Sequence, residues 1–169
     1  MIAVNGQFLI AQEMIVQMSA DFTLPVAATA TPIGNLNVEI IDNENRYAGT
    51  ATANSFTVSA SGVYQITVNM QLSYSLADNP VVGVWDNVAG NWVARVNDQH
   101  TAITTNTAPG TIFTLPLQTQ TLITSVNLDA ARTYSFRISA GNPSVIIKAM
   151  SSGSTGTGPV SQVSVKRLR

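Results

Sequence analysis

The sequence contains no cysteine among its 169 residues and only one histidine. Without cysteine the chain cannot form a disulfide, a thiolate nucleophile or a cysteine-ligated zinc or iron–sulfur site. A single histidine also excludes a metal site built from several histidines. No run of about 18 consecutive apolar residues occurs, so the sequence predicts no membrane-spanning helix.

Charge is also scarce. Charged residues make up 10% of the chain, against roughly 25% in an average soluble domain. The hydrophobic share of 45% is ordinary, so Thr, Ser, Asn and Gln replace the missing charges and the composition is not that of a disordered chain. A net charge of −1 offers no basic surface for nucleic acid or an anionic membrane. We therefore expect neither as a partner.

The N-terminal end lacks the positively charged start of a secretory signal, because the first basic residue is Arg46. We expect the protein to be made and assembled in the cytoplasm of its host, or to leave by a route without such a signal. Beyond Asp129 every charged residue is basic. Either neighbouring strands neutralise this basic C-terminal part, or it meets an acidic partner surface.

Apolar and polar residues alternate strictly from Tyr64 to Leu76. A period of two is typical of a half-buried β-strand and does not fit a helix, whose apolar residues recur every 3.6 positions. The segment 56–60 alternates in the same way, and Ser61-Gly62 separates the two runs. The sequence therefore predicts a β-hairpin here.

Further short apolar runs lie between turn residues along the rest of the chain, and the Gly/Ser/Thr-rich segment Ser151–Pro159 is expected to be a surface loop. Many short strands between Gly, Pro and Asn turns indicate an all-β antiparallel sandwich or jelly roll. The additional expected strands are Val81–Trp85, Trp92–Val96, Thr121–Leu128, Tyr134–Ser139, Val145–Met150 and a last strand around Val163 and Val165.

Residues 1–20 form a separate apolar segment in this reading, ahead of a jelly-roll domain at 21–169. Residues with helical spacing favour a helix, whereas Asn5-Gly6 between two apolar runs favours a hairpin, and both remain open. The segment is either an extra layer on the same core or an arm that docks on a partner. The candidate residues of a capsid anchor are Phe8, Ile10, Met14 and Met18.

From about Asp21 onward the pattern resembles the C1q/TNF-like jelly-roll family. The resemblance rests on Asn45-Arg46-Tyr47, then Phe56-Thr57-Val58, then Ser61–Val68. It continues in the strand pair around Val126–Asp129 and Tyr134–Arg137, and in the terminal strand from Val163 to Leu168.

The chain departs from that family in three ways. It has Ala130-Ala131-Arg132 where the family has Gly-Asp, it lacks the terminal Phe-x-Gly, and it has no collagen-like stalk. The resemblance implies a jelly roll that assembles as a compact homotrimer of the bacterial or phage type.

The polar face of the long strand carries no charge, although a solvated strand face usually includes Lys or Glu. Uncharged amides and hydroxyls suit hydrogen bonding against a sister subunit, where an unpaired buried charge would be costly. A charge-poor solvent face is the alternative. The residues predicted to lie at a subunit interface are Gln65, Thr67, Asn69 and Gln71.

Catalytic chemistry finds little support. His100 lies two residues from Asp98, but the nucleophile elbow Gly-x-Ser-x-Gly is absent, so we expect neither an enzyme nor a cofactor. The stretch Asp42–Asn45 offers oxygen ligands for Ca²⁺, although such stretches usually form turns. Trp85, Trp92 and Tyr74 are either a sugar-stacking platform or packing residues.

Two functions remain. The first is a non-enzymatic virion protein, a trimeric capsid decoration (cement) protein or head-fibre knob of a bacteriophage, whose partner is a capsid or other virion protein and whose location is the virion. The alternative is a C1q-like recognition module that binds glycan or protein receptors through exposed loops, with candidate loop residues Asp98, His100 and Thr104.

Overall fold

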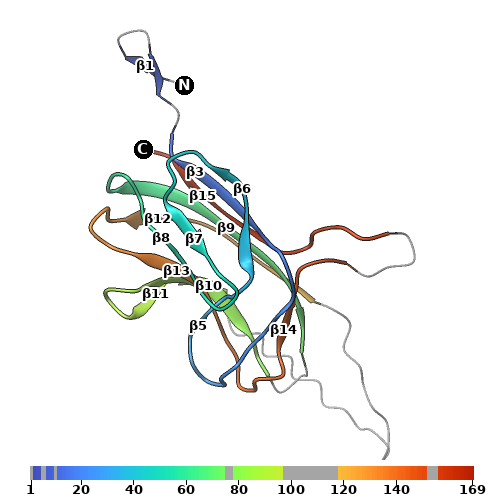
Figure 1. The fold of residues 1–169 in the computed structure, drawn as a ribbon. Coiled ribbons are helices and arrows are strands. Elements are labelled where there is room, and N and C mark those ends of the chain that lie inside the picture. Colours follow the sequence, from blue (N-terminus) through green and yellow to red (C-terminus); the bar gives the residue numbers. More distant parts are fainter. Residues whose placement is uncertain (1, 5–6, 10, 75–77, 97–117, 152–155) are drawn as a thin grey trace, which may run out of the picture.

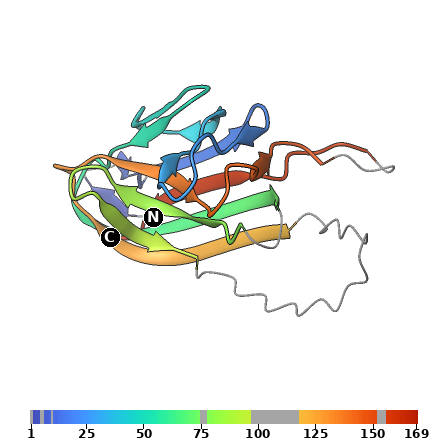
Figure 2. The same ribbon diagram turned by 90° about the horizontal axis from the view of Figure 1, so that it is seen from below.

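The computed structural model describes residues 2–4, 7–9, 11–74, 78–96, 118–151 and 156–169, with side chains from residue 11 onward. The described residues form β-strands and connecting segments, and no helix among them is long and apolar enough to cross a membrane. Two antiparallel sheets face each other as a sandwich (Figures 1 and 2).

The strands of the described residues divide into a seven-stranded sheet, a six-stranded sheet and a separate two-stranded hairpin. The seven-stranded sheet contains β3 (Glu13–Met18), β4 (Phe22–Thr23), β6 (Leu36–Asp42), β9 (Gly62–Ser73), β12 (Gln118–Leu128), β14 (Ile146–Lys148) and β15 (Gln162–Arg167). The six-stranded sheet contains β5 (Thr31–Pro32), β7 (Tyr47–Gly49), β8 (Asn54–Phe56), β10 (Val81–Asp86), β11 (Asn91–Arg95) and β13 (Tyr134–Ser139). The hairpin is β1 (Ile2–Val4) and β2 (Gln7–Leu9).

The strand order is that of a jelly roll. In the seven-stranded sheet β3, β15, β9 and β12 are neighbours in that order, and in the other sheet β8, β13, β10 and β11 are. The chain crosses between the sheets from β8 to β9, from β9 to β10, from β11 to β12 and from β12 to β13. Two interleaved antiparallel sheets of this kind define the architecture. The jelly-roll β-sandwich predicted from the sequence is confirmed.

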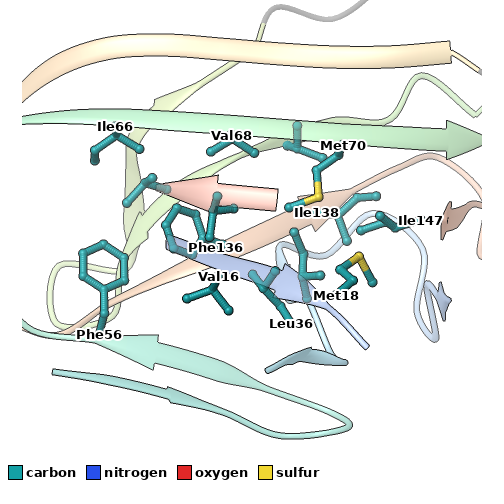
Figure 3. Packing of buried hydrophobic residues seen from close by; sticks show 14 of the residues in the cluster. Val16, Met18, Leu36, Phe56, Ile66, Val68, Met70, Phe136, Ile138 and Ile147 are labelled. Atoms are coloured by element: carbon teal, nitrogen blue, oxygen red, sulfur yellow. The ribbon is translucent and has the colours of Figure 1, made fainter. Parts of the chain in front are cut away.

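Alternation along β9 explains how the core forms. Tyr64, Ile66, Val68, Met70 and Leu72 are fully buried, while the residues between them face outward. Their side chains meet those of the opposite sheet between the two layers (Figure 3). The central cluster of Figure 3 includes Val16, Leu36, Phe56, Ile66, Met70, Phe136 and Ile138.

The hairpin predicted for 56–60 and Tyr64–Leu76 is wrong. Phe56 belongs to β8 and pairs with Tyr47 and Tyr134 in the six-stranded sheet, whereas β9 lies in the seven-stranded sheet. In a sandwich, two strands of opposite sheets both point alternate residues at one core, so alternation alone cannot tell a hairpin from a crossing. The segment around Ser61 carries the chain from one sheet to the other.

The boundary at residue 20 does not separate an arm from a domain, because β3 belongs to the sandwich. It pairs with β15 on one side and β6 on the other. Just before it, the buried Gln12 donates to the Thr57 carbonyl at 3.1 Å and accepts from the Ser59 N–H at 3.0 Å. The part that stands apart is the β1–β2 hairpin, which resolves the choice between helix and hairpin for residues 2–9.

Candidate interaction surfaces

The four predicted interface residues lie along β9 on the outer face of the seven-stranded sheet. Gln65 is exposed, and Thr67, Asn69 and Gln71 are half-buried. All four point away from the core because the residues between them point into it. Their placement agrees with the prediction, and their contact with a sister subunit stays a prediction.

The neighbouring strands continue this uncharged surface. Across from Thr67, the register brings Ile123 of β12 to one side and Ser164 of β15 to the other. Ser164 in turn pairs with Ile15 of β3, and Ile15 pairs with Ile41 of the edge strand β6. Ile123 is 66% exposed and Ile41 is 37% exposed. We call this surface the uncharged face; it comprises Gln65, Thr67, Asn69, Gln71, Thr121, Ile123, Gln162, Ser164, Ile15, Gln17 and Ile41.

The isoleucines of this face are not predicted by the alternation of apolar and polar residues. In the run Thr121–Leu128, Leu122, Val126 and Leu128 alternate with exposed residues, and Ile123 occupies one of the exposed positions. A large apolar side chain at a position that alternation assigns to the polar side is the signal that would have found it.

The charges at the margins of the uncharged face are paired within the chain. Lys166 lies 3.5 Å from Glu13 at one end, and Lys148 pairs with Asp21 at the other. Partial burial raises the pKa of Asp21. Hydrogen bonds from Lys148 and the Ala149 N–H lower this pKa by a larger amount, so it lies below its ordinary value. Each of these two lysines is thus neutralised by a carboxylate of the same chain.

Two pairs of polar side chains on the uncharged face bind each other. Thr121 donates to Asn69 Oδ1 at 2.8 Å, and Gln17 donates to Gln162 Oε1 at 3.3 Å. Beside them, a hollow of about 370 Å³ lies between Thr119 and the segment 159–162. Gln71 lines this hollow, and its Oε1 atom is buried without a hydrogen-bond partner among the described residues. An unpaired buried acceptor is costly unless a donor from outside reaches it.

The predicted capsid anchor divides into two parts. Met14 and Met18 are not part of an anchor, because both lie in β3 with their side chains buried in the core. Phe8 lies in β2, and Ile10 lies outside the described residues. Figure 1 shows the β1–β2 hairpin standing away from the sandwich, at the end where the C-terminus lies.

The loop residues proposed for receptor binding, Asp98, His100 and Thr104, lie outside the described residues. The other candidate loop is described in part. Its two sides are joined by a bridge between Met150 and Pro159 and by a 2.8 Å hydrogen bond from the Ser151 N–H to the Gly158 carbonyl. Figure 1 shows this segment extending beyond the sandwich.

The stretch considered for Ca²⁺ forms a turn at the end of β6. Asp42 accepts from the Tyr47 N–H at 2.8 Å, and Asn43 donates to the Ala11 carbonyl at 2.9 Å. Asn45 has a φ of 52°, a left-handed conformation that Asn tolerates well. In the described part of the chain, no group of three or more His, Cys, Asp or Glu side chains could hold a metal ion.

An ion-pair cluster closes one end of the sandwich beside a cleft of about 400 Å³. Arg132 donates to Asp86 at 2.6 Å and lies 3.9 Å from Asp129. Burial raises the pKa of Asp86, but the N–H groups of Ala89 and Val88 and the Arg132 guanidinium together hold it below its ordinary value. These contacts tie the β12–β13 turn to the β10–β11 turn.

Of the three aromatic residues considered as a platform, two come together. Trp85 of β10 and Trp92 of β11 are paired on the outer face of the six-stranded sheet. Tyr74 instead hydrogen-bonds Gln118 of β12, in the seven-stranded sheet.

No protein-family model matches this chain, and no curated protein matches it. Among solved structures it is similar to the PRD1 vertex protein P5, with 13% sequence identity and a TM-score of 0.44, over 94% of this chain and 96% of that chain. It is also similar to the carbohydrate binding module CBM6cm-2 from Cellvibrio mixtus lichenase 5A, in complex with cellotriose, with 12% identity and a TM-score of 0.32, over 90% of this chain and 100% of that chain. Both likenesses are distant.

Proposed function

We propose that this protein is a non-enzymatic structural component of a virion, a C1q/TNF-like homotrimer that decorates or reinforces a phage capsid or forms a head-fibre knob. The observation that carries the proposal is the uncharged face. It combines exposed isoleucines with amides and hydroxyls, and the charges at its margins are paired within the chain.

Such a face suits burial against another protein. Covering Ile123 and Ile41 removes apolar surface from water, at roughly 25 cal/mol per Å². The amides and hydroxyls of β9 exchange water for partners across the interface without the cost of desolvating a charge. A sister subunit would give the Gln71 acceptor a donor that none of the described residues supplies. A trimer therefore satisfies apolar and polar groups of this face together.

The β1–β2 hairpin supports the second part of the proposal, attachment to a capsid protein. An isolated two-stranded hairpin is at best marginally stable in water and needs a further strand or surface to pack against. The sequence of this hairpin is mostly apolar, so it suits packing against another protein. We propose that this partner is a virion protein. Binding to the assembled shell would stabilise that shell by mass action, without catalysis, cofactor, nucleic acid or membrane.

Sedimentation of the purified chain tests the trimer. We expect a mass about three times the 17.9 kDa of one chain. A monomer at micromolar concentration would contradict the proposal.

Attachment needs a separate experiment, for which residues 1–10 should be deleted. The deletion must stop before Gln12, because that residue and β3 hold the sandwich together. We expect the truncated chain to form trimers but to be absent from purified particles. Stoichiometric incorporation of the truncated chain would refute the anchor. The alternative function predicts that shortening the loop at 97–110 removes receptor binding.

A further inference from the structure

A β-bulge brings the two tryptophans of the chain to one surface. Trp85 pairs with Trp92, while Val84 pairs with Ala94, so Val93 is an extra residue in β11. Val84 faces the core, and strict alternation from Ala94 would turn Trp92 inward as well. The bulge shifts Trp92 to the outer face, next to Trp85. Bulges commonly re-aim side chains in this way beside functional sites.

The pair is held in a fixed geometry. The two rings meet edge to face, at 87° and with centroids 5.3 Å apart. On Trp85, the Arg137 guanidinium stacks 4.9 Å from the ring centroid. Arg137 itself donates to the Ser135 hydroxyl at 2.9 Å, the Ala30 carbonyl at 2.8 Å and Asn87 Oδ1 at 2.8 Å. Arg137 and Trp85 therefore brace Trp92, and little of its side-chain freedom remains to be lost on binding a ligand.

Trp92 borders an open hollow of about 270 Å³. Asn79 and Ser139 bring an amide and a hydroxyl to its lining, and Arg95 is the one charged residue among the described residues that line it. Among the described residues no carboxylate lines the hollow, so this lining does not favour a cationic ligand. Its volume lies just below the roughly 300–1,000 Å³ of drug-sized pockets, which limits a ligand to one small ring.

At Ala28 the backbone beside the hollow is strained. Ala28 and Asn79 both line it, with φ values of 54° and 39°. The left-handed region costs a residue such as alanine roughly 1–2 kcal/mol. Strain of this kind gathers at ligand-binding sites, where the fold maintains it for the shape that it gives. This observation is independent of the tryptophan pair.

We propose that this hollow binds one pyranose ring of a neutral oligosaccharide, stacked on Trp92. The apolar C–H face of a sugar ring suits the electron-rich face of an indole, and its hydroxyls suit the amide of Asn79 and the hydroxyl of Ser139. The site lies on the sheet opposite the uncharged face, so it is independent of trimer formation and reaches beyond the proposed virion role.

The two tryptophans give the experiment its readout, because the chain contains no others. Purified protein is titrated with gluco-, galacto- and manno-configured disaccharides, and the intrinsic fluorescence is followed. We expect a saturable change with at least one sugar at millimolar concentration or below. An unchanged spectrum with every sugar of the panel would overturn the proposal.

Variants then test the location, with binding measured by calorimetry. Trp92→Ala should weaken binding at least tenfold, and Asn79→Gly should weaken it several-fold while keeping the backbone conformation that glycine adopts freely. Val88→Ser, at an exposed position in the neighbouring turn, is the matched control and should bind as the native chain does.

The Asn79→Gly variant guards against a folding artefact, because it removes an amide at an exposed site and keeps a backbone conformation that both Asn and Gly adopt. Native affinity in both Trp92→Ala and Asn79→Gly would place the sugar elsewhere and refute the proposal. An Ile123→Lys variant should bind sugar with native affinity, which separates this proposal from that of the trimer.

Discussion

The two outer faces of the sandwich differ in how fully their side chains are engaged in contacts with other residues of the same chain. On the uncharged face, Ile123 is exposed and the Gln71 acceptor lacks a partner among the described residues. On the other face, Arg137 makes three hydrogen bonds and braces Trp85. A broad surface with unused groups suits a large protein partner, whereas one braced aromatic beside a hollow suits a small ligand. The same fold thus offers two kinds of recognition on opposite sides.

The largest expected effect comes from placing a charge on the uncharged face, compared with the same charge in a turn at the edge of the other sheet. Ile123→Lys should abolish the trimer, because leaving an unpaired charge in a buried interface costs roughly 3–5 kcal/mol. Val88→Lys, at a residue equally exposed at 66% but in the β10–β11 turn, should leave the trimer intact. Sedimentation of both variants measures the difference. Equal behaviour of the two would remove the distinction between the faces.

Replacing one cation on each face tests how rigidly each is held. Arg137→Met should lower the free energy of unfolding by about 2–3 kcal/mol, because three hydrogen bonds and a cation–π contact are lost. Lys166→Met should change it by less than about 0.5 kcal/mol, since its pair with Glu13 is largely exposed. Urea denaturation compares the two. A cost for Lys166→Met as large as that for Arg137→Met would show that the uncharged face is as tightly organised.

The smallest effect is a difference in acid sensitivity. The folded pKa of Asp86 lies below its ordinary value, so its contribution to stability is complete above about pH 4 and is lost as the pH falls through the folded pKa. Asp86→Asn should therefore be less stable than the native chain at pH 7, and the difference in stability between the two should be smaller at pH 3. The more exposed Asp21 should show the same trend more weakly in Asp21→Asn. Denaturation midpoints at both pH values test this ranking.

Much of the jelly roll could be predicted from alternation, because each long strand buries every second residue. Alternation does not decide the structure where a helical spacing and a strand spacing coincide. Ile10, Met14 and Met18 recur every four residues, which fits both a helix and every second inward position of a strand, so the local pattern leaves residues 13–18 open between an extra layer on the core and an arm. Pairing with β15 and β6 decides in favour of the strand, and such long-range pairing is invisible to a local pattern.

The two surfaces were predictable to different degrees. The outward row of β9 follows directly from its alternation. The meeting of Trp85 and Trp92 does not, because it depends on the bulge at Val93, which breaks the alternation of β11. The brace from Arg137 depends on contacts with Ala30 and Asn87, which lie far from it in the sequence.

The place of β15 between β9 and β3 also governs the order in which the chain folds. β3 can pair early with β6, but among the described strands that unit joins the rest of its sheet through β15, which lies far along the chain. Pairings this distant in sequence form slowly, since a long loop must close first. Met14, Val16 and Met18 therefore stay uncovered by β15 until that strand has been synthesised, and we expect slow refolding that is prone to aggregation at high concentration.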